Sequence, residues 1–185
     1  MKKLIATTLL CTAAGLAAYA QGTVNFANVG AGFNAPVVLN DGTTKAGAGY
    51  TAVLMAGPSA SSLTQIATTP LLTGAQAGFF LGGVQSISTV AGGGTATILI
   101  DIYNSGAYSS FAAAQTANAP NAWAQSSMFT VTTGNPNASP PTTPGTFAPL
   151  GTTPIALNPG GVPEPSTFAL AGLGAAALLF FRRRK

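Results

Sequence analysis

The stretch Thr95–Tyr103, TATILIDIY, carries the strongest strand signal in this chain. Side chains alternate between the two faces of a strand, so three isoleucines at alternate positions share one face: Ile98, Ile100 and Ile102. The glycine-rich run Ala91–Gly94 directly before this stretch predicts a turn. We therefore expect a long strand whose isoleucine face fills a core and whose other face, which includes Asp101, meets solvent.

On both sides of this strand, short apolar runs alternate with turn residues, which is typical of all-β domains. Asp41-Gly42 predicts a hairpin turn, because both residue types accept positive φ. Phe111–Ala117 (FAAAQTA) is the one helical stretch expected outside the two ends. The pattern predicts a single antiparallel β-sandwich over residues 21–133 and leaves jelly-roll and immunoglobulin-like topologies open. The other candidate strands are Thr23–Phe26, Pro36–Leu39, Tyr50–Ala56, Leu63–Ala67, Gly78–Leu81, Val84–Val90 and Gln125–Thr133.

The composition changes after this body. Residues 134–161 are rich in proline and threonine, a composition typical of an extended, semi-rigid spacer. Such a spacer would hold the body away from a membrane. Phe147 and the run Thr153–Leu157 (TPIAL) are the exception, because they could supply a final edge strand, where proline is tolerated.

The N-terminal residues 1–20 have the three parts of a secretory signal peptide. Lys2 and Lys3 form the positive region, and an apolar stretch follows up to Ala18-Tyr19-Ala20. The small residues Ala18 and Ala20 match the pattern that signal peptidase cuts, which would make Gln21 the mature start. The alternative, a membrane anchor, is disfavoured because the apolar stretch is short and lacks a stop-transfer flank.

The C-terminal tail, residues 162–185, has three ordered parts. The expected helix 167–181, Thr167 followed by the apolar run Phe168–Phe181, would rise about 22 Å, against a hydrocarbon core of about 30 Å. Local thinning of the bilayer and snorkelling arginines can accommodate this mismatch, so we expect a short transmembrane helix. The basic end would lie in the cytoplasm and the body outside it. The alternative, a buried core helix, is disfavoured by the consecutive cations. The flanking parts are Val162, Pro163, Glu164 and Pro165 before the run, and Arg182, Arg183, Arg184 and Lys185 after it.

This arrangement resembles the PEP-CTERM sorting signal, in which a Val-Pro-Glu-Pro motif, one membrane helix and an arginine-rich end follow one another. The resemblance covers only the tail. It implies a Gram-negative envelope protein that an exosortase, a membrane enzyme thought to cut near the motif, processes after transient anchoring in the inner membrane. Family members are commonly associated with exopolysaccharide and biofilm matrix, so a location at the cell surface or outside the cell is expected.

The charges of the chain lie mostly in its ends. The net charge is +4, but six of the seven Lys and Arg residues fall within the first three and last four positions. Residues 21–161 retain Lys45, Asp41 and Asp101, one positive and two negative charges, which sum to −1. A nucleic-acid partner is therefore not expected, because the basic residues do not belong to a binding face.

The body also lacks most residues that carry enzymatic chemistry. It contains no His, Glu or Cys, which excludes Ser-His-Asp and Cys-His arrangements and removes the usual zinc ligands. Asp41 is explained by its turn, and a glycosidase would need to pair it with Asp101, the remaining acid. We expect no catalytic residue, no metal and no cofactor, and we predict a structural envelope or matrix protein.

The alternative function is a carbohydrate-binding module that docks on exopolysaccharide. Aromatic rings can stack on sugars while amides bind hydroxyl groups, and three aromatic residues lie near asparagines in the sequence. Large aromatics more often pack against a core, so we expect Trp123 to do so and name no binding residue. The residues that raise this alternative are Trp123, Tyr103 and Tyr108, near Asn104, Asn118 and Asn121.

Overall fold

The computed structural model describes residues 21–161. Its longest sheet is built around β8 (Thr95–Asn104), which confirms the strand expected from TATILIDIY. This sheet has the order β10-β8-β5-β6, and β9 pairs with β8 beside β10. β1 pairs with β7, and β11 with β4 in the one parallel pairing among these strands. The remaining elements are β1 (Gln21–Ala27), β2 (Val29–Gly30), β3 (Phe33–Asn34), β4 (Val37–Val38), β5 (Tyr50–Gly57), η1 (Ala60–Ser62), β6 (Thr64–Pro70), η2 (Gly74–Gln76), β7 (Leu81–Ala91), α2 (Phe111–Ala117), β9 (Trp123–Gln125), β10 (Phe129–Thr132), η3 (Ala148–Leu150) and β11 (Ile155–Ala156).

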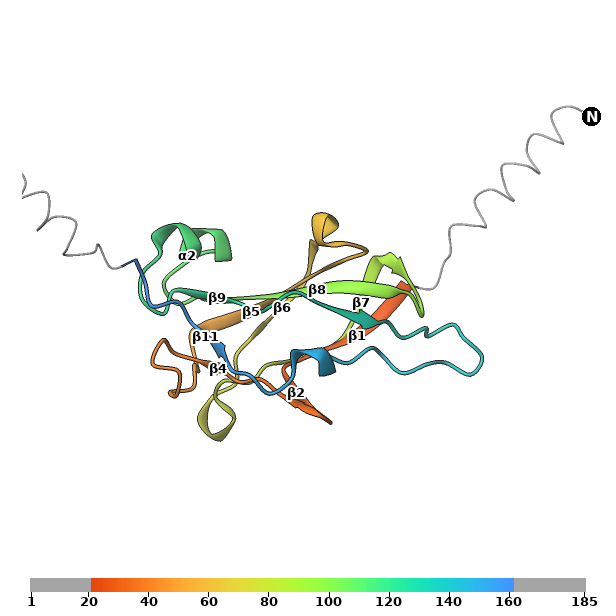
Figure 1. The fold of residues 1–185 in the computed structure, drawn as a ribbon, viewed down its shortest axis with the longest axis horizontal. Helices are drawn as coiled ribbons and strands as arrows, with labels where there is room; N and C mark the ends of the chain where they lie inside the picture. The colour runs from red at the N-terminus through yellow and green to blue at the C-terminus, as the bar shows by residue number, and fades with distance from the viewer. Residues whose placement is uncertain (1–20, 162–185) are drawn as a thin grey trace, which may run out of the picture.

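The strands form two layers. Figure 1 shows β5, β6, β8 and β9 above β1, β2, β4 and β11, with α2 on the outer side of the larger sheet. The predicted turn before β8 is present. Gly93 has φ 79°, and the Gly94 N–H donates to the Ala91 carbonyl at 2.9 Å. Through this turn the chain passes from β7, which pairs with β1, to β8 in the larger sheet, so these consecutive strands lie in different sheets. The described part of the chain is thus mostly β with antiparallel sheets, as predicted.

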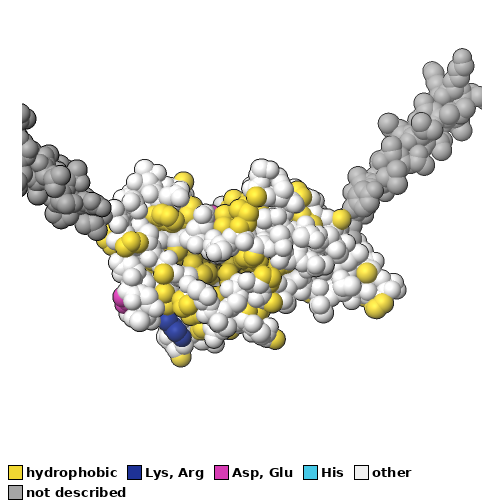
Figure 2. Space-filling model, in the orientation of Figure 1, with side chains coloured by type: hydrophobic (Ala, Val, Ile, Leu, Met, Phe, Trp, Pro, Cys, Tyr) yellow, Lys and Arg dark blue, Asp and Glu magenta, His cyan; other side chains and the backbone are white. Residues whose placement is uncertain are grey.

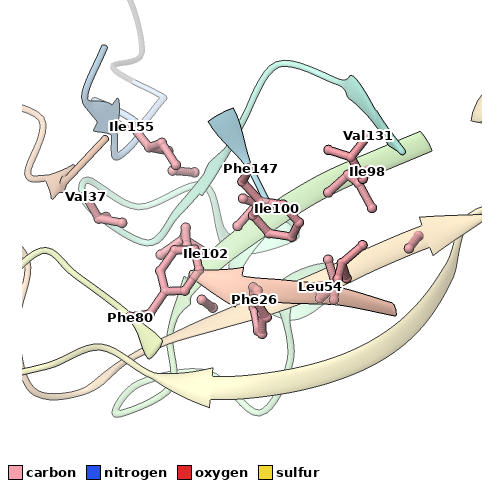
Figure 3. Close-up of a cluster of buried hydrophobic side chains, with 14 of the residues drawn as sticks. Phe26, Val37, Leu54, Phe80, Ile98, Ile100, Ile102, Val131, Phe147 and Ile155 are labelled. Atoms are coloured by element: carbon pink, nitrogen blue, oxygen red, sulfur yellow. The ribbon is translucent and has the colours of Figure 1, made fainter. Parts of the chain in front are cut away.

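The isoleucine face of β8 fills the space between the layers. Ile98, Ile100 and Ile102 have no exposed surface, as predicted, and they point toward buried aromatic rings (Figure 3). The rings of Phe26 and Phe80 lie 4.9 Å apart between centroids in a tilted arrangement. Burial of such side chains contributes about 1.5–3 kcal/mol each. The core therefore joins β8 to segments that are far apart in the sequence.

The predicted spacer is part of this core. Phe147 is fully buried and packs edge-to-face on Phe129 at a centroid distance of 5.4 Å. Ile155 and Leu157 are also buried, and Ile155–Ala156 forms β11 against β4. The prediction of an extended spacer over 134–161 is therefore corrected, and the reservation about a final strand in Thr153–Leu157 is confirmed. Apolar residues between prolines anchor a segment whose composition alone suggested an unpacked chain.

A buried asparagine joins three loops beneath the sheet. Asn28 has no exposed surface, and its Nδ2 donates to the carbonyl oxygens of Ala35 and Gly78, both at 2.9 Å. Its Oδ1 accepts from the Phe80 N–H at 2.8 Å. Burial of an amide without such partners costs several kcal/mol, so this side chain specifies how the loops meet.

Candidate functional site

The sequence placed the functional residues at the two ends of the chain. The sorting residues Val162–Pro165, the basic residues Arg182–Lys185 and the cleavage residues Ala18 and Ala20 lie outside the described residues. Gln21 is exposed, and it begins β1 opposite Ala91. Among residues 21–161 no helix has the length and apolar character needed to cross a bilayer. The predicted transmembrane helix 167–181 also lies outside the described residues.

The structure shows how the chain approaches the sorting residues. Residues 157–161 run along the loop that follows α2, and the described chain ends beside α2 (Figure 1). Hydrogen bonds join Asn158 in this segment to Asn118 and Asn121 in the loop after α2. We refer to these three residues as the asparagine clasp. The N–H of Gly161 donates to the Asn118 carbonyl at 2.9 Å, so the last described residue before Val162 is still bound to the domain.

Asn158 is the centre of the clasp. Its Nδ2 donates to Asn118 Oδ1 at 3.0 Å, and its Oδ1 accepts from the Trp123 N–H at 3.0 Å. The backbone of Asn158 makes two further hydrogen bonds. Its N–H donates to the Trp123 carbonyl at 2.8 Å, and its carbonyl accepts from the Asn121 N–H at 2.9 Å. The C-terminal segment is therefore tied to β9 and to the loop before it by four hydrogen bonds at one residue.

Local backbone chemistry explains why asparagine occupies the other two positions. Asn118 ends α2 at φ 45°, and Asn121 lies at φ 58°, both in the left-handed region that asparagine tolerates better than most residues. Asn121 also links the clasp to the rest of the domain. Its Oδ1 accepts from the Asn40 N–H at 2.7 Å, and its carbonyl accepts from the Tyr50 hydroxyl at 3.1 Å.

The two acids of the described region occupy different environments. Asp41 caps its turn as predicted, with Oδ1 accepting from the N–H groups of Thr43 and Thr44 at 2.9 and 2.8 Å. The Thr44 hydroxyl, followed by these backbone N–H groups, lowers the pKa of Asp41 to about 2. Asp41 is therefore ionised over the physiological range and serves the turn.

Asp101 was expected to face solvent, and this prediction is wrong. The side chain is 6% exposed because β5 and β9 flank it, with Val53 on one side and Gln125 on the other. Gln125 Nε2 donates to Asp101 Oδ1 at 2.7 Å. Burial raises the pKa of Asp101, and the Gln125 hydrogen bond partly offsets this effect. The carboxylate is thus held in a place that disfavours its charge.

These acids do not form a metal or catalytic cluster in the described residues. Asp41 lies after β4 and Asp101 in the middle of β8, and no group of three His, Cys, Asp or Glu residues occurs within 21–161. Lys45 places its Nζ 4.9 Å from the centroid of the Phe79 ring, a cation–π contact. Figure 2 shows how few charged side chains interrupt the polar and apolar surface.

The aromatic residues near asparagines do not present an open stacking platform. Trp123 is half-buried beneath α2, where its ring meets Phe111 edge-on at 5.8 Å between centroids. Its Nε1 is buried and has no hydrogen-bond partner within residues 21–161. Asn118 and Asn121 are engaged in the clasp, and Asn104 Oδ1 accepts from the Gly106 N–H at 3.1 Å. Trp123 thus packs on Phe111 of α2 and not against the main hydrophobic core, so the expectation that it packs against the core is wrong.

A groove opens elsewhere, between the start of β10 and the segment that leads into β11. Its volume is about 340 Å³. Apolar side chains and small hydroxyl or amide groups share its walls, and none of them is charged. The sequence did not indicate this groove, because its two walls lie about 25 positions apart in the chain. The residues that matter below are Gln125, Ser127, Met128, Phe129, Thr153 and Ile155.

The family comparison concerns the residues directly after the clasp. Residues 161–185 match the PEP-CTERM protein-sorting motif. This confirms the resemblance of the tail and implies an exported protein that an exosortase sorts to the cell surface. No curated protein and no solved structure matches the chain. The PEP-CTERM motif therefore begins where the described domain ends, at Gly161.

Proposed function

We propose that this protein is a structural component of the cell envelope or extracellular matrix, delivered through its PEP-CTERM tail and associated with exopolysaccharide or biofilm matrix. The observation that carries this proposal is the sorting motif directly behind a folded domain with almost no charge. A neutral surface attracts no ionic partner and repels no second copy, which suits dense packing outside the cell. The two strand layers around one core support a single β-sandwich.

The delivery route has four steps. Signal peptidase removes residues 1–20, the tail anchors the body transiently in the inner membrane, an exosortase processes the chain near Val162–Pro165, and the body is incorporated outside the cell. The body itself performs no catalysis in this proposal. It has two carboxylates in different environments and no His or Cys, which leaves no pair suited to acid–base or nucleophilic work.

Mass spectrometry of both termini of the native protein tests this route. We expect a mature start at Gln21 and loss of the residues that follow the Val162–Pro165 region. Material released from cells that still carries Lys185 would contradict sorting. A body whose start lies before Gln21 would contradict the predicted signal cleavage and leave the tail unaffected.

A second candidate function is binding of neutral glycan, and the uncharged groove between β10 and β11 favours it. Its volume of about 340 Å³ lies within the range of small-ligand sites. The hydroxyl groups of Ser127 and Thr153 can bond sugar hydroxyls, while Phe129 and Ile155 supply apolar contact. This site differs from the one that Trp123 suggested in the sequence, because that ring is covered by α2.

Pull-down with exopolysaccharide purified from the producing bacterium separates the two candidates. Met128 lines the groove and is 46% exposed, so Met128→Ala should weaken binding without unfolding the domain. Val84→Ala is the matched control, because Val84 is a similarly exposed apolar side chain, 58%, on β7. Equal binding by both variants would reject the groove, and absence of binding by the unaltered protein would leave the purely structural role.

A further inference from the structure

We propose that the asparagine clasp faces the membrane and the processing enzyme, and that its opening limits how fast the PEP-CTERM tail is processed. This inference rests on the proposed delivery route. It concerns the end of the domain formed by α2, the loop after it and residues 157–161. The clasp residues are Asn118, Asn121 and Asn158, with the Gly161 backbone bond.

The length of chain beyond the clasp sets the position of this surface. The apolar run begins at Phe168, seven residues after Gly161. A fully extended chain spans at most about 3.6 Å per residue, so these two positions are at most about 25 Å apart. The polar headgroup layer takes up about 5–8 Å of this length. The clasp end therefore lies within about 20 Å of the membrane surface while the tail is anchored.

That space is small for an enzyme that must reach the sorting motif. The exosortase is a membrane enzyme, so only the part of it that projects from the bilayer must fit in this gap, and a projecting domain of about 30 Å would exceed it. The enzyme must therefore work against the clasp end of the domain or wait for the segment to detach. Residues 158–161 would add about 14 Å of extended chain if the clasp opened. Opening thus relieves the crowding without unfolding the core, because Leu157 remains the last buried side chain.

The chemistry of the clasp suits local opening. Its bonds join polar groups near the surface, with Asn158 half-buried and Gly161 exposed. Regions held by exposed hydrogen bonds, with little apolar burial, open at lower free energy than the core. Processing from an open minor state proceeds at a rate proportional to the population of that state. The helix α2 and the three clasp asparagines carry no charge, so no electrostatic repulsion keeps this end from a lipid surface.

Pulse-chase labelling of the full-length chain in its producing bacterium tests the proposal, with loss of the tail followed by gel mobility and mass. Asn158→Ala removes the two side-chain hydrogen bonds of the clasp centre, to Asn118 and from Trp123. We expect processing about 25-fold faster, because the variant loses two hydrogen bonds and each shifts an equilibrium by about a factor of five. Asn137→Ala is the matched control, an exposed asparagine in another loop, and should leave the rate unchanged.

A second variant does not depend on the stability of the domain. A Gly/Ser linker of about twelve residues inserted between Gly161 and Val162 supplies the missing reach. We expect it to speed processing as much as Asn158→Ala, and we expect the two changes together to add little more. If the unaltered chain is processed and the linker variant matches its rate, the clasp proposal is overturned while sorting stands. If the unaltered chain keeps its tail, both proposals fail.

Discussion

Replacement of Phe147 by alanine is the sharpest test of the domain boundary. The ring is fully buried, lies 6.3 Å from Phe26 between centroids and packs edge-to-face on Phe129. An aromatic side chain buries about 150–250 Å², and Phe→Ala in a core costs about 3–5 kcal/mol. A domain of this size has a stability of about 5–15 kcal/mol, so Phe147→Ala removes a large share of it.

Urea unfolding of residues 21–161, followed by tryptophan fluorescence, measures this loss. With a slope of about 2 kcal/mol per molar urea, a loss of about 4 kcal/mol lowers the midpoint by about 2 M. Thr146→Ala is the matched control, since Thr146 is the exposed residue directly before Phe147. If Phe147→Ala unfolds within about 0.3 M of the unaltered domain, residues 134–161 are a spacer after all and the core ends near Thr133.

Two further substitutions probe buried polar groups. Asp101→Asn should raise the thermal midpoint at pH 7: burial raises the folded-state pKa, so stability falls as pH rises from the unfolded value through the folded one. The gain in thermal midpoint should shrink below pH 4, where Asp101 is protonated and residue 101 is therefore neutral in the unaltered protein and in the variant. An equal gain at pH 3 and pH 7 would exclude an effect of the Asp101 charge. Asn28→Ala leaves the Ala35 carbonyl and the Phe80 N–H without partners and should cost about 3–5 kcal/mol in urea unfolding, whereas Asn25→Ala, at an exposed position of β1, should cost little.

Alternation predicted the centre of the fold well. Ile98, Ile100 and Ile102 are fully buried because a strand in the middle of a sheet keeps its period of two. The helix at Phe111–Ala117 also has the predicted bounds, with the Ser110 side chain accepting from the Ala113 N–H at its start. Both elements depend on local sequence, so the sequence contains what determines them.

The errors arose where distant segments meet. Alternation assigned Asp101 to the outer face correctly, but it carries no information on what covers that face. The predicted strand Gln125–Thr133 is split into β9 and β10, because Ser126 Oγ accepts from the Ile100 N–H at 3.0 Å and interrupts the run. The proline-rich composition of residues 134–161 gave no sign that Phe147, Ile155 and Leu157 are buried in the core. The asparagine clasp was missed for the same reason, since its members are about 40 positions apart and no local pattern joins them.

The order of segments in the chain distinguishes the two processing events. β1 begins at Gln21, but its partners, β7 and the bridge at Gly134, come much later in the sequence. During export, β1 therefore cannot pair until about half of the body has crossed, and we expect cleavage after Ala20 to act on an unpaired chain. The clasp has the opposite order, because Asn118 and Asn121 precede Gly161 and can bind it as soon as it emerges. An exosortase that acts at the PEP-CTERM motif then meets a domain that is already closed. A physical barrier to processing is thus expected at the C-terminal end and not at the N-terminal one.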